Sequence, residues 1–521
     1  MNHDMARIER SPRDVARWRK AQEKLLSGRH AAALSDYRDL SSRFPGVAEI
    51  WFELGNAAAG NLDFPLANQA YRRALELAPD NSSLISLIGH QFQSLRQLSD
   101  ARACFERAVA ANPESVDARI NLAVWLEKDR RLAEAWDQVE ACRARHPRDD
   151  QARYFRAFLL HRQKLSGQAE VELRDLIRDG PQYPYVKYAS RHLLGVLLDE
   201  LGQYDEAMTW LLEAKAVLRT ITDTAALERG YDETERKRQD LLAAITPETI
   251  RRWRDEAPPA SEDDYQFAFL GGHPRSGTTL LEQILGAHPQ VLAFDEPDAF
   301  TREITSQLAV MGSAADNSFR NLDRLSAAGI DDMRQRYALS LLREIDDAGT
   351  ASILLDKNPS PTSSLPIWLR VFPELKVIIA LRDPRDVVIS CFFLNIMLNA
   401  TNVNFLSLER TAKHYADLMG TWLRMREVGG FEWVESRYED VVADLEGEGQ
   451  KVTRFLGLDW HANQARYDEA ARSKVIFAPT YHDVTRQVYQ SAVGRWQRYA
   501  SALEPLHEVL DPFSRAFGYS G

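Results

Sequence analysis

The stretch Gly271–Glu296, GGHPRSGTTLLEQILGAHPQVLAFDE, decides how the second half of the chain folds. It follows the apolar and aromatic run Tyr265–Leu270 (YQFAFL), which predicts a β-strand. Glycines then allow a sharp turn with exposed N–H groups, and the apolar spacing over Leu280–Leu285 predicts a helix. Because a helix N-terminus carries free N–H donors and a partial positive charge, this order of strand, loop and helix predicts a site for a phosphate or sulfate group.

The side chains of this loop suit an anion. Ser276, Thr278 and Thr279 supply hydroxyl donors, and Arg275 supplies a guanidinium that can pair with two oxygens. The glycine spacing that ends at Gly277 nearly reproduces the P-loop of nucleoside-triphosphate enzymes, but Thr278 stands where that motif has lysine. Without the lysine, no group reaches the β- and γ-phosphates, so an ATP or GTP hydrolase is disfavoured and a shorter anionic group is indicated.

The run PRSGTTLLEQIL (274–285), followed by DEP (295–297), resembles the 5′-phosphosulfate loop of sulfotransferases, particularly the group that contains protein-tyrosine sulfotransferases and bacterial tetratricopeptide-repeat sulfotransferases. That family uses 3′-phosphoadenosine 5′-phosphosulfate (PAPS) as the donor, and no metal is obligatory. The resemblance therefore implies that the loop binds the donor through Arg275, Ser276, Gly277, Thr278 and Thr279.

Two later predicted strands are followed by cationic residues. The run TASILL predicts a strand before Lys357, whose ammonium can face charge that develops on a transferring group. The run LKVIIAL predicts a buried parallel strand before Arg382, and Ser390 follows eight residues later, about two helical turns on, so both could grip one phosphate. The resemblance implies that Lys357 acts on the transferred group and that Arg382 and Ser390 bind the 3′-phosphate. Arg385 is expected at the surface or in a salt bridge.

Two further segments resemble the family near the C-terminus. The run FEWVES (431–436) predicts an edge strand, and the following RYEDVV resembles a segment whose tyrosine helps to hold the nucleotide. This tyrosine is Tyr438, for which a role in core packing is the alternative. The late VGRW resembles an element that closes over the donor, which makes Arg495 a candidate phosphate ligand.

The run QVLAF (290–294) predicts a further strand, and the general base is expected in the DEP sequence that follows it. The resemblance implies that Glu296 corresponds to the presumed base of the tyrosine-sulfating enzymes, and Asp295 is its nearest rival. Small-molecule sulfotransferases usually use histidine, but His273 and His288 are poorly placed for this role, and His273 is expected to fill the turn. The expected catalytic residues are therefore Glu296, Lys357 and Arg275.

The first half of the chain is a repeat array. Its period is thirty-four residues, and the residues that show it are Pro45, Pro79, Pro113, Pro147 and Pro181 together with Ala33, Ala67, Ala101, Ala135 and Ala169. The alanines permit close packing of helix pairs and the prolines end each pair, which is the tetratricopeptide signature. Trp51, Tyr71 and Phe105 are expected to belong to the core of these pairs.

The predicted architecture is an all-α tetratricopeptide solenoid followed by an α/β sulfotransferase domain, with a P-loop-like parallel sheet and helices on both faces. The expected boundaries are 12–222 for about six repeats, 223–262 for capping helices and linker, and 263–521 for the sulfotransferase domain. Residues 301–349 and 395–428, which lack motifs, are expected to line the acceptor site.

Composition restricts the partners and the location. The net charge of −11 disfavours binding to nucleic acid or acidic membranes. Three separated cysteines suggest neither a disulfide framework nor a zinc site, and the charged N-terminus shows no signal peptide or membrane span, so a cytoplasmic protein is expected.

These observations favour a PAPS-dependent sulfotransferase. The preferred acceptor is a peptide or protein hydroxyl, with tyrosine as the named candidate, because a repeat array can bind polypeptide. A saccharide or lipid hydroxyl is the alternative. Two other functional classes stay open, a catalytically silent tetratricopeptide scaffold and a P-loop phosphotransferase.

Overall fold

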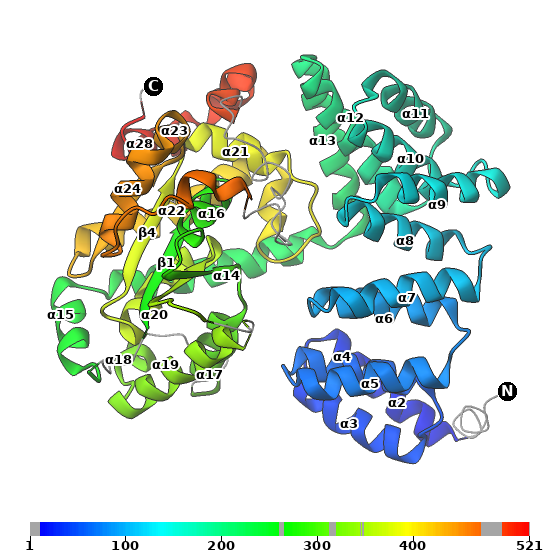
Figure 1. The fold of residues 1–521 in the computed structure, drawn as a ribbon, viewed down its shortest axis with the longest axis horizontal. Helices are drawn as coiled ribbons and strands as arrows, with labels where there is room; N and C mark the ends of the chain where they lie inside the picture. Colours follow the sequence, from blue (N-terminus) through cyan, green and yellow to red (C-terminus); the bar gives the residue numbers. More distant parts are fainter. Residues whose placement is uncertain are drawn as a thin grey trace. The chain divides into compact units, whose positions relative to one another are not determined.

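The computed structural model describes residues 11–259, 265–311, 319–343, 345, 348–469 and 492–519. The chain divides into two compact units, Met1–Leu201 and Gly202–Gly521 (Figure 1). The first unit is helical and the second contains a parallel sheet with helices, which confirms the predicted fold class. The division after Leu201 separates two sets of residues that mainly contact one another, and it does not test the predicted domain boundaries at 222 and 263, which stay predictions.

The ten helices from α2 to α11 form five successive pairs, each joined by a short turn, and α12 and α13 follow them in the chain. Their bounds are α2 Pro12–Leu26, α3 His30–Arg43, α4 Ala48–Gly60, α5 Phe64–Leu77, α6 Ser82–Ser94, α7 Leu98–Ala111, α8 Val116–Lys128, α9 Leu132–Arg145, α10 Asp150–Arg162, α11 Ser166–Asp179, α12 Pro184–Glu200 and α13 Tyr204–Ile221. The last of them, α13, belongs to the second compact unit.

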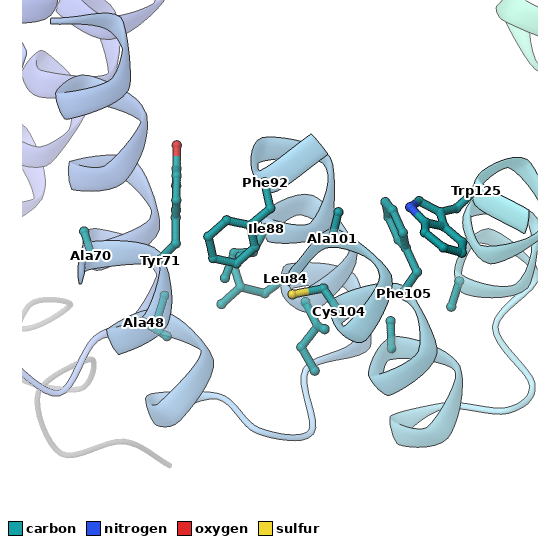
Figure 2. Close-up of a cluster of buried hydrophobic side chains, with 14 of the residues drawn as sticks. Ala48, Ala70, Tyr71, Leu84, Ile88, Phe92, Ala101, Cys104, Phe105 and Trp125 are labelled. Carbon is teal, nitrogen blue, oxygen red and sulfur yellow. The ribbon is translucent and has the colours of Figure 1, made fainter. Parts of the chain in front are cut away.

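Aromatic side chains over small residues pack the helix pairs together (Figure 2). Tyr71 is fully buried and meets Phe92 edge to face, with ring centroids 5.7 Å apart. A Cβ atom on Gly55 would lie only 2.4 Å from the Tyr71 ring, so the glycine makes room for the aromatic side chain. Tyr71 and Phe105 are core residues, as predicted, whereas Trp51 is only partly buried against the core.

The turn inside each of the first five pairs contains one residue with left-handed backbone. The first of these residues is Gly28, with a φ of 72°. The four equivalent residues that follow are Leu62, Arg96, Arg130 and Lys164, with φ between 59° and 63°. A left-handed conformation is costly for residues that carry a Cβ, so the repeat geometry imposes it at the same position each time.

Five parallel strands form the sheet of the second unit in the order β2-β3-β1-β4-β5. Their bounds are β1 Gln266–Gly272, β2 Val291–Asp295, β3 Ile353–Lys357, β4 Lys376–Leu381 and β5 Trp433–Arg437. All five strands were predicted from the sequence, and β5 is an edge strand, as expected. Because the strands are parallel, the segments that follow them all start at one edge of the sheet.

Helices cover both faces of this sheet. Their bounds, with the short 3-10 and π turns, are α14 Thr224–Ala243, α15 Pro247–Glu256, α16 Thr278–Gly286, η1 Thr301–Thr305, α17 Ser306–Met311, α18 Phe319–Asp323, α19 Ala327–Leu342, η2 Ser360–Ser364, α20 Leu365–Val371, α21 Pro384–Phe392, η3 Asn402–Leu406, α22 Leu408–Val428, α23 Tyr438–Ala443, α24 Leu445–Phe455, η4 Gln464–Arg466, η6 Arg495–Tyr499, α27 Ala500–Leu503, η7 Glu504–Leu506 and α28 His507–Ala516.

Alternate residues of β1 show which helices pack on which face. Ala268 and Leu270 belong to a buried cluster with residues of α16 and α24. Phe269 points the other way, where its ring centroid lies 5.1 Å from that of Trp368 on α20. The helix α14, which the sequence analysis interpreted as a cap on the repeats, is present and contacts α22 and η3.

Candidate active site

The loop between β1 and α16 makes the sharp turn that its glycines predict. Gly272 has a φ of 126°, and a Cβ atom there would lie 2.3 Å from the carbonyl oxygen of Ala380 on β4. Gly277, with a φ of 87°, is the N-cap of α16. Thr362 fixes the start of the loop, because its hydroxyl accepts a hydrogen bond from the Gly272 N–H at 2.8 Å and donates one to the Gly272 carbonyl at 3.1 Å.

A cavity of about 440 Å³ lies at this loop. Nine of the predicted site residues line it, namely Arg275, Gly277, Thr278, Thr279, Glu296, Arg382, Ser390, Tyr438 and Arg495. Two predicted residues, Ser276 and Lys357, are buried and do not belong to the lining. Most of the residues that the sequence analysis selected therefore meet at one place, although they come from five different segments.

Arg275 joins the two motifs that the sequence analysis assigned to opposite ends of the donor. Its Nε donates a hydrogen bond to Ser390 Oγ at 2.9 Å. Arg382 Nη1 donates to the Arg275 carbonyl at 3.1 Å. Arg275 itself has a φ of 75°, a left-handed conformation that side-chain-bearing residues adopt at a cost. The loop after β1 and the segment after β4 are thus in direct contact.

Arg382 and Tyr438 form one side of the cavity. The Arg382 guanidinium lies 5.0 Å from the centroid of the Tyr438 ring, a cation–π distance. A Cβ atom on Gly277 would lie 2.6 Å from Tyr438 Cδ2, so the tyrosine packs closely on the phosphate loop. Tyr438 therefore packs against the loop and also lines the cavity, while its role in holding a nucleotide stays a prediction.

Asp386 ties the C-terminal segment to α21. Its two carboxylate oxygens accept hydrogen bonds from the N–H groups of Gly494 at 2.8 Å and Trp496 at 2.7 Å. Burial raises the pKa of Asp386, and the nearby Arg382 acts against this rise. The intervening residue Arg495 lines the cavity, with its guanidinium 4.1 Å from the centroid of the Phe393 ring. Nothing in the sequence pattern had distinguished Asp386.

Arg385 is buried rather than at the surface. It forms a salt bridge with Asp383 at 2.7 Å, which is one of the two alternatives that were expected. Its guanidinium lies 3.7 Å from the centroid of the Trp496 ring.

Lys357 lies behind the cavity between two acidic residues. Its Nζ is 3.1 Å from Glu296 Oε1 and forms a second ion pair with Asp295, to which it is aligned across neighbouring strands. Burial by itself would lower the pKa of Lys357, but Glu296, Asp295 and Glu282 raise it above the ordinary value. The lysine is therefore charged and fully buried, and it contacts the lining residue Glu296 without lining the cavity itself.

Glu296 and Asp295 differ in their surroundings. The Glu296 side chain is 47% exposed and lines the cavity, whereas that of Asp295 is 16% exposed and faces Lys357. Glu296 has a φ of 50°, and its N–H donates to the Lys357 carbonyl at 2.8 Å. Of the two candidate bases, Glu296 is thus the one that can meet a molecule in the cavity.

His273 is fully buried in the turn, as expected. Its Nε2 lies 2.9 Å from His414 Nδ1, and its Nδ1 lies 2.8 Å from the Pro274 carbonyl oxygen. Burial lowers the pKa of His273 to about 4. His288 is held at the carbonyl oxygen of Asp459, at 3.1 Å. Neither histidine is among the residues that line the cavity.

The rest of the lining comes largely from the segment between α21 and α22. Its seven residues are Leu394, Asn395, Ile396, Met397, Thr401, Asn402 and Phe405. Of the two segments that were expected to line the acceptor site, 395–428 contributes its first residues, up to Phe405, to this cavity. The described residues of 301–349 contribute nothing to the lining. Tyr467, which the sequence analysis also missed, belongs to the lining, and no local motif marked it.

Comparison with known proteins agrees with the two halves of the chain. Residues 268–462 match the sulfotransferase family, and residues 19–82, 87–141 and 188–217 match tetratricopeptide repeats. The chain is 27% identical to protein-tyrosine sulfotransferase 1 of Danio rerio over 275 residues, which cover 50% of this chain and 73% of that protein.

Two further similarities have lower sequence identity. An uncharacterized protein of Aquifex aeolicus is 22% identical over 449 residues, which are 84% of this chain but only 51% of that protein. The chain therefore spans about half the length of this relative. The sulfotransferase domain of the Synechococcus PCC 7002 olefin synthase is similar with 20% identity and a TM-score of 0.32, over 48% of this chain and 96% of that domain.

Within the described residues, no helix has the length and apolar character needed to cross a membrane. In one chain, segments that match tetratricopeptide repeats are followed by a segment that matches the sulfotransferase family.

Proposed function

We propose that this protein is a sulfotransferase that moves a sulfuryl group from PAPS to an acceptor hydroxyl. The observation that carries the proposal is the meeting of two anion-binding motifs at one cavity, through the hydrogen bond from Arg275 to Ser390. A donor with phosphates at both ends of an adenosine needs such a pair of sites within the reach of one molecule. The family match of residues 268–462 supports the same reaction.

The lining fits such a donor in size and charge. A volume of about 440 Å³ lies in the range of roughly 300–1,000 Å³ that is usual for small-molecule sites. Arg275, Arg382 and Arg495 bring three guanidiniums to the lining, and the N-terminus of α16 adds N–H donors. Tyr438 offers a ring on which a base can stack. These groups would hold phosphate and sulfate oxygens without a metal ion.

In the proposed reaction, the acceptor hydroxyl attacks sulfur, an oxygen–sulfur bond forms, and the bond from sulfur to the 5′-phosphate oxygen breaks. Glu296 takes the acceptor proton and later releases it to water, and the products are the sulfate ester and 3′-phosphoadenosine 5′-phosphate (PAP). Both acids pair with Lys357, and Glu296 is the proposed base because it also lines the cavity, whereas Asp295 does not. Arg275 is proposed to stabilise negative charge on the transferred group and the leaving phosphate.

The proposed role of Lys357 differs from the one that its sequence position suggested. It is fully buried and is separated from the cavity by Glu296, so we assign it to holding Glu296 and Asp295 in place. The positive charge of Lys357 also stabilises the negative charge that develops on the leaving 5′-phosphate oxygen.

The proposed acceptor is a peptide or protein hydroxyl, with tyrosine as the first candidate. The tetratricopeptide repeats, which commonly bind polypeptide, and the similarity to a protein-tyrosine sulfotransferase support it. The three cysteines are buried free thiols, which supports a reducing compartment such as the cytoplasm.

Calorimetry tests the donor. We expect metal-independent binding of PAP by the full chain and loss of this binding in Arg382→Ala, because the variant removes a guanidinium from the lining. Arg424→Ala is the control and should bind PAP as the wild type does, because Arg424 pairs with Glu427 and does not belong to the lining. Binding of magnesium ATP alone would identify a phosphotransferase instead, and binding of neither nucleotide would leave a scaffold without this chemistry.

Labelling tests the acceptor. The enzyme is incubated with ³⁵S-labelled PAPS and a cell extract, and the labelled product is separated into protein, glycan and lipid fractions. Label in protein that resists glycosidase treatment and appears as sulfotyrosine on hydrolysis is the expected result. Label confined to glycan or lipid would replace the peptide proposal with a saccharide or lipid acceptor.

A further inference from the structure

One wall of the cavity carries no charged side chain. It consists of the seven lining residues between α21 and α22, from Leu394 to Phe405, and is called the uncharged wall below. Among the described residues, the guanidiniums of the lining lie on other segments, at Arg275, Arg382 and Arg495. Since a doubly phosphorylated donor is recognised by cations and N–H groups, the uncharged wall is the part of the cavity that remains for the acceptor.

A buried lysine on α13 holds the start of this wall. Lys215 is 1% exposed, and its Nζ donates a hydrogen bond to the Leu394 carbonyl at 2.9 Å. The same ammonium lies 5.4 Å from the centroid of the Phe392 ring. This burial lowers the pKa of Lys215 to about 7. A polar group buried at this cost is stabilised only by the partners it finds there, so its bond to the wall is specific.

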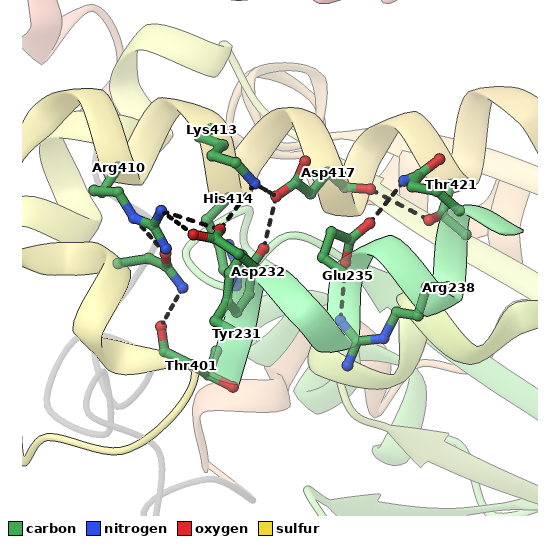
Figure 3. A network of polar contacts seen from close by, with 12 residues as sticks. Tyr231, Asp232, Glu235, Arg238, Thr401, Arg410, Lys413, His414, Asp417 and Thr421 are labelled. Atoms are coloured by element: carbon green, nitrogen blue, oxygen red, sulfur yellow. Dashed lines mark hydrogen bonds and ion pairs between the residues drawn. The ribbon is translucent and has the colours of Figure 1, made fainter. Parts of the chain in front are cut away.

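A chain of hydrogen bonds from α14 holds the other end of the wall (Figure 3). Asp232 accepts from Arg410 Nη1, with both carboxylate oxygens at 3.0 Å. Arg410 Nε donates to Asn404 Oδ1 at 3.0 Å, and Asn404 Nδ2 donates to the Thr401 carbonyl at 2.9 Å. Asn404 is fully buried. The backbone of a lining residue is therefore connected to α14 through two intermediate side chains.

A second contact of α13 reaches the segment that carries Arg495. Tyr204 meets Tyr499 edge to face, with ring centroids 5.9 Å apart. Tyr499 in turn contacts Phe393 at 5.4 Å between ring centroids, next to the residue that Lys215 holds. The helix α13 thus supports the cavity from behind at two neighbouring places.

We propose that α13 and α14 shape the acceptor-binding side of the active site, with Lys215, Asp232 and Asn404 as positioning residues for the uncharged wall. The inference rests on the proposed function and adds to it a part of the chain that lies before the sulfotransferase match, which begins at residue 268. Lys215 belongs to the segment 188–217 that matches a tetratricopeptide repeat, so the last repeat helix contributes directly to the second unit.

The test uses the full chain with three variants, Lys215→Met, Asp232→Asn and Asn404→Ala. Each removes one hydrogen-bonding group of the support and leaves every lining side chain in place. Two matched controls come from α14, where Lys237 and Asp240 form exposed pairs with Glu233 and Arg236. The controls are Lys237→Met and Asp240→Asn, which change the same chemical groups at positions that do not contact the wall.

Three measurements are made on each protein. Hydrogen–deuterium exchange reports the protection of residues 394–406, calorimetry reports PAP affinity, and transfer from PAPS to a tyrosine-containing peptide reports KM and kcat for the acceptor. We expect exchange in 394–406 about fivefold faster or more, as for the loss of one hydrogen bond. PAP affinity and kcat should stay within about twofold, while the acceptor KM rises by about fivefold or more in the three variants and in neither control.

The outcomes separate the inference from the proposed function. Failure of the wild-type protein to bind PAP would refute the proposed function. Normal PAP binding with unchanged exchange at 394–406 in Lys215→Met and Asn404→Ala would refute the inference alone. A parallel loss of PAP affinity and acceptor KM would also overturn it, because the support would then act on the whole cavity rather than on the acceptor side.

Discussion

Arg275 Nε donates a hydrogen bond to Ser390 Oγ at 2.9 Å, although 115 positions of sequence separate the two residues. The contact arises because β4 pairs with β1 on the side opposite β3, so the segments after β1 and β4 are neighbours at one edge of the sheet. This is the point where the strand order reverses, which is where open parallel sheets usually bind ligands.

Removal of the Ser390 hydroxyl tests this contact. Ser390→Ala removes one hydrogen-bond partner of the Arg275 guanidinium, and a hydrogen bond to a charged group contributes about 1.5–3 kcal/mol. We expect PAP affinity, measured by calorimetry, to fall roughly tenfold or more. Ser42→Ala, which removes an exposed hydroxyl bonded to the Arg38 carbonyl in α3, is the control. Equal affinities of the two variants would show that Arg275 needs no positioning by Ser390.

The identity of the base is tested with Glu296→Gln. This change keeps the size of the side chain but removes its ability to accept a proton, so kcat should fall by about 10²–10⁴-fold while PAP affinity stays within about twofold. Asp295→Asn should act mainly on stability, since it leaves the buried Lys357 with one fewer ion pair. The assignment would be reversed if Asp295→Asn abolished turnover without loss of stability and Glu296→Gln remained active.

The close packing of Tyr438 on the phosphate loop predicts a strong effect of Gly277→Ala. The added Cβ would lie 2.6 Å from Tyr438 Cδ2, and the backbone φ of 87° would be strained by about 1–2 kcal/mol. We expect PAP affinity to fall by more than about tenfold, as measured by calorimetry. Gly180→Ala has a similar φ of 73° but open space around its Cβ, and it should leave PAP affinity unchanged. Full affinity of Gly277→Ala would show that the loop can move away from Tyr438.

The buried histidines predict acid sensitivity. Burial lowers the pKa of His273 to about 4, from an ordinary value near 6.5, so the folded protein keeps this ring neutral where the unfolded chain binds a proton. The stability that the neutral ring contributes is therefore fully present above about pH 6.5 and is lost as the pH falls towards 4, by up to about 3 kcal/mol. His414 has its pKa lowered by burial and by His273, so it acts in the same direction.

The measurement is the dependence of the thermal midpoint on pH between 6.5 and 4. His273→Gln should show a shallower decline than the wild type, whatever its absolute stability. His507→Gln, which changes an exposed histidine paired with Asp511, should decline as the wild type does. Identical slopes in all three proteins would exclude His273 as a source of the acid sensitivity.

The left-handed turns of the repeats predict a stabilising substitution. Arg130 is exposed and has a φ of 62°, a conformation that glycine adopts without the cost imposed by a Cβ. Arg130→Gly should stabilise the repeats by about 0.5–1 kcal/mol, seen as a higher midpoint in thermal unfolding followed by circular dichroism. Arg130→Ala keeps a Cβ and should give no such gain. An equal gain in both variants would attribute the effect to the lost charge.

The sequence alone determined the parts of this protein that depend on neighbouring residues. A thirty-four-residue period predicts paired helices because each pair repeats the same local packing, and the aromatic residues Tyr71 and Phe105 proved to be core. Runs of apolar residues predicted the five strands, and the motifs that follow β1, β4 and β5 identified Arg275, Arg382 and Tyr438. In parallel sheets, polar residues after strands gather at one edge, so local pattern sufficed to select most of the lining.

Only the tertiary structure decided which of these residues face the cavity. Lys357 and Glu296 both follow strand-like runs, yet pairing of β2 with β3 buries the lysine beside Asp295 and leaves the glutamate exposed. The uncharged wall, with its support from Lys215, carries no motif because its partners lie far away in the chain. Burial and charge pairing depend on contacts between distant residues, and the order of the strands, which sequence patterns do not encode locally, sets those contacts.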